Sequence, residues 1–222
     1  AGHGIDKAML TWKDGDGELA VVETRTVHPV ILLDAAGRAY TVRPSDLPGG
    51  KGDGVPAASL VELQGSRIIA LLSAPTETRV LMATSAGVGF IGRMADMVSR
   101  QRAGKAYMTV DEGAEMLPPS RVPEGARFIA ALADEPRLLL FPIEEIKEQP
   151  GGKGVILMGL DAGERLLASA AVADCVTITG LGRGDKVVEY QVCADNADSF
   201  AGRRARKGKP LPVKFKRVLG LN

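Results

Sequence analysis

The sequence predicts an all-β protein, built as a propeller-like ring of four-stranded units of roughly 50 residues each. Three observations support this prediction. Four segments share one plan, each segment has the pattern of two short strands around a tight turn, and one aromatic residue recurs in the four segments at nearly constant spacing. The segments begin at Pro29, Arg79, Arg127 and Cys175.

The first segment shows the plan most clearly. VILLD and RAYTV are apolar runs rich in β-branched and aromatic residues, and AAG lies between them with the glycine that a tight hairpin turn needs. The stretches Ser59–Ser73 and Gly154–Val172 contain further short strands, so each unit is expected to hold about four strands. We expect little helix beyond single turns at PSDL, MADMV and PIEEI.

Regular spacing supports true repetition. The aromatic residues Tyr40, Phe90, Phe141 and Tyr190 follow one another at intervals of 50, 51 and 49 residues, and their place inside apolar runs predicts that they pack in the core. The loop lysines Lys51, Lys105, Lys153 and Lys207 recur at intervals of 54, 48 and 54. The predicted organisation is one domain over 1–222, with a partial unit at about 1–28 and full units at 29–78, 79–126, 127–174 and 175–222.

The first residues do not start a clean repeat. They look like the closing strands of a preceding unit, so we expect the chain to begin inside a longer polypeptide. The ring is expected to be either closed or open, and an open ring would have to protect its edge strands in some other way.

Composition and charge limit the function classes. The 222 residues carry a net charge of +1 and contain no apolar run of the ~20 residues that a membrane helix needs. The start has no signal-peptide pattern, and the sparse cysteines, Cys175 and Cys193, form no motif, which is typical of a reducing cytoplasm. The segment Ala201–Asn222 has eight basic residues and no acidic one, whereas the other 200 residues contain 20 basic and 27 acidic ones. Such asymmetry indicates a polyanionic partner or a solvated terminus.

Each unit places a loop rich in glycine and basic residues after its second apolar run. Cations spaced around a rim can neutralise the phosphates of duplex DNA without reading its sequence, and adjacent glycines allow close approach of the backbone. A single loop of this kind is more often a turn with a solvated lysine, but its recurrence favours a function. The predicted DNA-binding residues are Lys51, Arg100, Arg102, Lys105, Lys153, Arg203, Arg204, Arg206 and Lys207.

No catalytic, cofactor or metal site is predicted. His3 and His28 are the only histidines, and neither they nor the cysteines have metal-ligand spacing. No G-x-S-x-G nucleophile motif occurs. Four aspartates stand at turns, where capping of backbone N–H groups is the expected role. They are Asp34, Asp46, Asp96 and Asp134.

The segments GRAYTVRPSDLPGGKGDG, LMATSAGVGFIGRMADMVSRQRAGKAYMTV and LLLFPIEEIKEQPGGKG resemble the C-terminal domain of the topoisomerase IV A subunit, the ParC family. The resemblance runs from Gly2 to about Gly208. It implies a β-pinwheel whose blades exchange strands and which binds and bends duplex DNA around its rim. It also implies a cytoplasmic, nucleoid-associated enzyme in which this domain adjoins the catalytic core of the same polypeptide. With a ParE-like B subunit it would form an A2B2 complex that uses ATP and Mg²⁺, while this fragment would itself hold no cofactor and catalyse nothing.

Two alternatives stay open. The gyrase A subunit has a similar domain with a basic QRRGGKG loop, which SRQRAGKA and AGRRARKGK approach without matching in full. A propeller that serves as a protein-interaction platform is the alternative from another class, and the excess of acid outside the tail mildly favours it.

Overall fold

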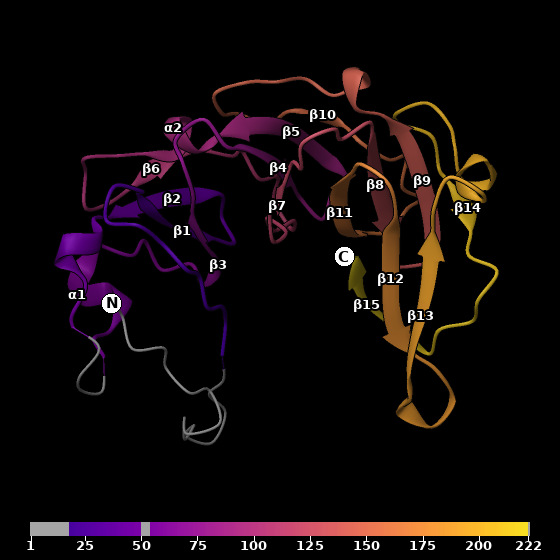
Figure 1. The fold of residues 1–222 in the computed structure, drawn as a ribbon, viewed down its shortest axis with the longest axis horizontal. Helices are drawn as coiled ribbons and strands as arrows, with labels where there is room; N and C mark the ends of the chain where they lie inside the picture. The colour runs from indigo at the N-terminus through magenta and orange to yellow at the C-terminus, as the bar shows by residue number, and fades with distance from the viewer. Residues whose placement is uncertain (1–17, 50–53, 222) are drawn as a thin grey trace.

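The computed structural model describes residues 18–49 and 54–221 of the chain. Four antiparallel sheets stand side by side along an open arc (Figure 1). Each is built on one hairpin, which confirms the predicted all-β class. The hairpins are β1 (Val30–Asp34) with β2 (Arg38–Val42), β4 (Arg79–Ala83) with β5 (Val88–Arg93), β8 (Phe128–Ala133) with β9 (Arg137–Pro142), and β12 (Val176–Leu181) with β13 (Val187–Val192).

A third strand pairs with the first strand of each hairpin and lies toward the concave side of the arc (Figure 1). It follows its own hairpin in the chain. These inner strands are β3 (Ile68–Ser73) on β1, β7 (Ser120–Arg121) on β4, β11 (Leu166–Val172) on β8 and β15 (Arg217–Leu221) on β12.

The fourth strand of a sheet comes from the next unit. After each of the second, third and fourth hairpins, two residues return to the preceding sheet and pair with the second strand of its hairpin. These exchanged strands are β6 (Lys105–Ala106) on β2, β10 (Val155–Ile156) on β5 and β14 (Lys209–Pro210) on β9. Within the described residues, β13 receives no such strand, and the last sheet has three strands.

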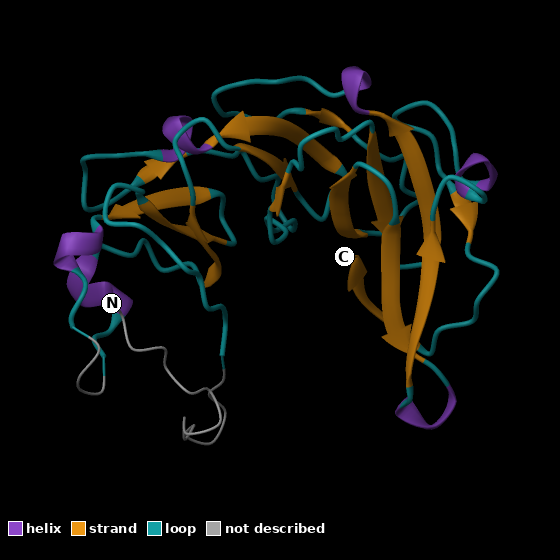
Figure 2. Ribbon diagram, in the orientation of Figure 1, coloured by secondary structure: helices purple, strands orange, loops and turns teal. Residues whose placement is uncertain are grey.

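Helical segments are short, as Figure 2 shows, and three of them are the single turns predicted from PSDL, MADMV and PIEEI. These are η2 (Pro44–Asp46), α2 (Met94–Met97) and η3 (Ile143–Glu145). The others are α1 (Ala57–Leu60), η4 (Arg183–Asp185) and η5 (Ala197–Ser199).

Aspartates organise two of the hairpin turns as predicted. The Asp34 carboxylate is buried and accepts hydrogen bonds from the backbone N–H groups of Ala36 and Arg38, at 3.0 and 2.9 Å. The Asp134 carboxylate accepts hydrogen bonds from different backbone N–H groups, those of Glu135 in its own turn and of Arg165 just before β11, at 2.9 and 3.0 Å. The two aspartates in short helices differ, because neither helix has a capping side-chain bond. Asp46 forms an ion pair with Arg43 instead, at 2.9 Å.

The hydrophobic core lies between adjacent sheets rather than in one central mass. One cluster joins the first and second sheets through Leu33, Phe90 and Tyr107. Another joins the second and third through Leu81, Phe141 and Leu157, and a third joins the last two sheets through Leu140, Ile178 and Phe200. A small fourth cluster around Tyr40 and Val61 covers the outer face of the first sheet, at the start of the arc.

Strand register corrects the aromatic alignment inferred from spacing. The exchanged strands pair with Ala39, Gly89 and Leu138 at one equivalent position. Counting from these residues makes Tyr40 and Phe90 equivalent, whereas Phe141 stands at the place of Gly92, two residues further on the same face of the strand. Tyr40, Phe90 and Phe141 are nevertheless fully buried, as predicted, while Tyr190 is partly buried. Trp12 lies outside the described residues.

The two cysteines form a disulfide, which the sequence had not indicated. Cys175 precedes β12 and Cys193 follows β13, so the antiparallel pairing of Val176 with Val192 brings them opposite each other, with Cα atoms 4.3 Å apart. They are 18 residues apart in the chain, and only the hairpin register makes them neighbours.

Candidate nucleic-acid interface

Three basic loops occupy the same position in successive units. Each leads directly into an exchanged strand, and β6, β10 and β14 lie on the convex side of the arc (Figure 1). The loops span residues 98–104, 146–154 and 201–208. The structure therefore brings most of the predicted cations to one rim, at successive angles. Lys51 lies outside the described residues.

The predicted cations in and next to the first loop differ in whether their side chains have contact partners. Arg100 is exposed, and its side chain makes no hydrogen bond or ion pair to any described residue. Arg102 donates from Nη2 to the Ser59 carbonyl at 2.9 Å, and the Lys105 ammonium lies 5.9 Å from the centre of the Tyr107 ring.

A groove of about 650 Å³ separates this loop from the end of β2, and it also contains Arg43, which the sequence pattern does not single out. Arg43 donates to Asp46, and this hydrogen bond raises the pKa of the arginine and lowers that of the aspartate. Lys147 on the second loop is an exposed cation that was also not predicted, and Lys209, exposed at the start of β14, belongs to the basic C-terminal segment noted in the sequence. Membership of the loop that precedes an exchanged strand is the signal that would have found Lys147.

The last loop mixes free and engaged cations. Arg203 and Arg206 are exposed, and their side chains have no partner among the residues described. Arg204 is half-buried: its backbone N–H donates to Glu145 at 2.8 Å and its Nη1 donates to the Ile156 carbonyl at 2.6 Å. Arg204 thus holds the loop against the preceding unit. The basic segment from Ala201 onward folds onto the arc through β14 and β15.

Two rim lysines are paired with carboxylates. The Lys153 ammonium lies 2.8 Å from Asp111, and the Lys207 ammonium contacts Asp161. The hydrogen bond from Lys207 is the main cause of a lowered pKa of Asp161. Strand register makes these two lysines equivalent, whereas Lys105 corresponds to Lys209. The lysine spacing read from the sequence therefore combined two different positions.

Glycines in these loops serve strand exchange. A side chain at Gly104, Gly154 or Gly208 would place its Cβ only 2.4, 2.2 and 2.7 Å from a backbone carbonyl oxygen of the preceding sheet. All three also have positive φ. The Gly152 N–H donates to the Tyr107 carbonyl at 2.8 Å and is therefore occupied.

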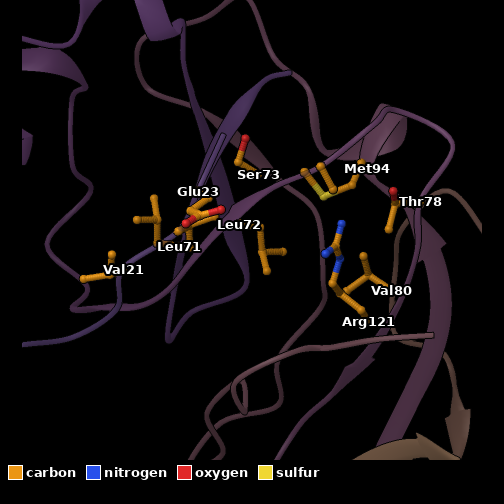
Figure 3. Close-up of a pocket in the computed structure, with 11 residues that line it drawn as sticks. Val21, Glu23, Leu71, Leu72, Ser73, Thr78, Val80, Met94 and Arg121 are labelled. Carbon is orange, nitrogen blue, oxygen red and sulfur yellow. The ribbon is translucent and has the colours of Figure 1, made fainter. Parts of the chain in front are cut away.

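Figure 3 shows a pocket of about 340 Å³ on the concave side, which is lined by Val21, Glu23, Leu72, Met94 and Arg121 among others. Its other lining residues are mostly apolar. Among the described residues that line it, Glu23 and Arg121 are the only ones with ionisable side chains. Over residues 18–49 and 54–221, no group of three metal-ligating side chains occurs, and no helix is long and apolar enough to cross a membrane.

Comparison with known proteins finds clear relatives, although no family model matches the sequence. The A subunit of DNA topoisomerase 4 from Neisseria gonorrhoeae is 35% identical over 226 residues, which cover 96% of this chain and 28% of the relative. The corresponding protein of Escherichia coli K12 is 33% identical over 164 residues, 73% of this chain and 22% of the relative. The chain thus spans about a quarter of the length of these proteins.

Solved structures of related domains match the fold of this chain. The E. coli ParC C-terminal domain matches with a TM-score of 0.86 and 26% identity, over all of this chain and 91% of that one. The DNA gyrase A C-terminal domain matches with a TM-score of 0.66 and 14% identity, over 90% of this chain and 66% of that one, which is a likeness of fold.

The strand-exchanged sheets and these matches define a β-pinwheel of the class that forms the C-terminal domains of type IIA topoisomerase A subunits. Within this class, the chain belongs with the C-terminal domains of topoisomerase IV A subunits.

Proposed function

We propose that this chain binds duplex DNA along its convex rim, without sequence preference, and bends it for a topoisomerase IV. The observation that carries the proposal is the recurrence, on equivalent loops, of exposed arginines whose side chains have no partner among the described residues. Arg100 lies on the first loop, and Arg203 and Arg206 lie on the last, two junctions further along the arc. Lys51, Arg102, Lys105, Lys153, Arg204 and Lys207 complete the proposed set.

The curved arrangement suits bending. Smooth bending of 20–30 base pairs by tens of degrees costs about 1–6 kcal/mol, and several phosphate contacts spread over the rim can offset that cost. A single cationic loop could not, because its contacts would all lie on one short stretch of duplex.

The rest of the proposed enzyme lies outside this chain. We propose that the domain adjoins the DNA-cleaving core of the same polypeptide, and that Mg²⁺ and an ATP-hydrolysing, ParE-like B subunit act there in a cytoplasmic A2B2 complex. The role of this chain is to hold and present a DNA segment to that core.

The gyrase alternative requires a QRRGGKG loop. The described loop closest to it, SRQRAGKA, carries alanine in place of the first of its two adjacent glycines. The two relatives from N. gonorrhoeae and E. coli, both A subunits of topoisomerase IV, also support topoisomerase IV.

The test is a gel shift with unrelated duplexes of about 30 and 150 base pairs at 50 and 200 mM salt. We expect stronger binding to the longer duplex and a steep loss with salt. The variant R100A/R203A/R206A removes three side chains without internal contacts and should weaken binding to every duplex equally. The variant R183A/K186A/K214A removes three other exposed cations outside the three loops, and it should bind as the parent does. Absence of binding at 50 mM salt would reject the proposal in favour of a protein-interaction platform.

A further inference from the structure

We propose that Asp111 and Asp161 set the strength of DNA binding by holding the rim lysines Lys153 and Lys207, which a DNA phosphate must take from them. This inference rests on the proposed function and deepens it. It divides the rim into one site at the first loop, whose cations have no carboxylate partner among the described residues, and two sites whose lysines are held by carboxylates.

The same pair occurs twice, at successive junctions. Lys153 and Lys207 each stand directly before the glycine that precedes an exchanged strand, and each ammonium contacts an aspartate of the unit before its own. Asp111 and Asp161 are equivalent because each lies two residues before a turn glycine with positive φ, Gly113 and Gly163.

At the first junction both partners are missing together. The residue at the lysine position is Ala103, and the residue two before the turn glycine Gly65 is Leu63. The cations of this loop, Arg100 and Arg102, form no ion pair with a carboxylate of any described residue. Lysine and aspartate are thus both absent from this junction and both present at the other two, as expected if they act as a pair.

The pairs are open to competition by phosphate. The side chains of Lys153 and Asp111 are 52% and 43% exposed, and those of Lys207 and Asp161 are 62% and 56% exposed. Ion pairs this exposed are weak, because water screens both charges. A phosphate can therefore displace the carboxylate, which remains nearby and repels the DNA backbone.

A purely structural link between units is the competing interpretation. At the third junction that role is already filled by the exchanged strand β14, which pairs with β9 of the preceding unit. The largely buried ion pair of Glu164 and Arg137, with 4% and 15% of their side chains exposed, lies within that preceding unit. Asp161 lies outside that buried pair, with its nearest carboxylate oxygen 3.7 Å from the guanidinium. Its removal should leave the buried contact in place.

The experiment measures DNA affinity of the 222-residue chain and of the variants D111N, D161N and D111N/D161N by fluorescence anisotropy on a duplex of about 150 base pairs, between about 50 and 200 mM salt. Each asparagine should tighten binding about two- to fivefold, the range that corresponds to an exposed ion pair, and steepen the salt dependence by about one phosphate contact. The double variant D111N/D161N should combine the effects of the two single substitutions on affinity and on salt dependence.

The control is E112Q, which removes the exposed negative charge next to Asp111 and has no lysine partner among the described residues. We expect E112Q to change affinity less than either asparagine variant. Equal tightening by E112Q would overturn the proposal, because net charge alone would then explain the effect.

Unchanged or weaker binding by D111N/D161N would also overturn it, and a fall in urea stability alongside would assign the pairs to unit linkage. These results are distinct from failure of the proposed function, in which the parent chain itself would not bind DNA.

Discussion

Gly92 and Tyr107 form a contact that predicts a strong coupling between two substitutions. A Cβ at Gly92, on β5, would lie 1.9 Å from the Tyr107 hydroxyl oxygen and 3.1 Å from the ring carbon that bears it. The tyrosine cannot easily withdraw, because it is 2% exposed and its ring packs edge-on against Phe90 at 5.7 Å. Gly92→Ala should therefore destabilise the chain by about 1–3 kcal/mol, the usual cost of overpacking.

Tyr107→Phe should act in the opposite direction. The Tyr107 hydroxyl is buried and has no hydrogen-bond partner among the described residues, and a buried unsatisfied polar group costs about 1–3 kcal/mol. Removing it should stabilise the chain by about 1 kcal/mol and open space for the alanine. In the Tyr107→Phe background, Gly92→Ala should then cost little, which gives a coupling of about 2 kcal/mol between the two sites.

Urea unfolding followed by circular dichroism measures all four members of this cycle. Gly89→Ala is the matched control, because its Cβ would meet the Met82 carbonyl at 2.3 Å and Tyr107→Phe should not rescue it. The coupling is refuted if Gly92→Ala costs the same in both backgrounds, or if Tyr107→Phe rescues Gly89→Ala as well.

Three further predictions concern other features. Ala205 has φ of 66°, so Ala205→Gly should raise the unfolding free energy by about 1 kcal/mol, and a lower value in urea would show that the turn is not strained. Burial, with a smaller contribution from Asp96, raises the pKa of Tyr107 above its ordinary value of 10.0. Tyr107 therefore ionises at lower pH in the unfolded state than in the folded state, so its contribution to the free energy of unfolding is fully present below pH 10.0 and is lost as the pH rises further. Urea unfolding at several pH values above 10.0 should show a smaller loss of unfolding free energy for Tyr107→Phe than for the parent chain. Reduction of the Cys175–Cys193 disulfide should lower the unfolding free energy by up to about 3 kcal/mol, and a Cys175→Ser/Cys193→Ser variant should not respond to reductant.

Local features of the fold could be predicted from the sequence, because their determinants are adjacent in the chain. The hairpin of β1 and β2 follows from two apolar runs around Gly37, whose φ is 85°. The exchanged strands could not be predicted in the same way. Arg38 pairs with Ala106, far along the chain, and the three two-residue strands have no composition in common. The glycine before each strand is their only shared signal.

The sequence predicted which loops carry the basic residues of the candidate site, but it did not predict the ion pairs that these residues form. Spacing alone equates Lys105 with Lys153 and Lys207, and only strand register shows that Lys105 corresponds to Lys209 instead. The carboxylates that hold these lysines come from the preceding unit, so no local pattern identifies them. The aromatic side chain also stands at different positions in different units. In the second unit, Gly92 leaves room for the ring of Tyr107. In the third unit, Phe141 occupies the position of Gly92 and belongs to the same core cluster as Leu157.

Strand exchange also has a consequence for synthesis on the ribosome. The third sheet contains β8, β9 and β11, yet its outer strand is β14, which the chain reaches only at Lys209. Every sheet that receives an exchanged strand must therefore wait, with one edge open, until the next hairpin has been translated. Folding of the arc should lag translation by one unit, and a chain stalled before Lys209 would expose β9 as an unpaired edge to other nascent chains.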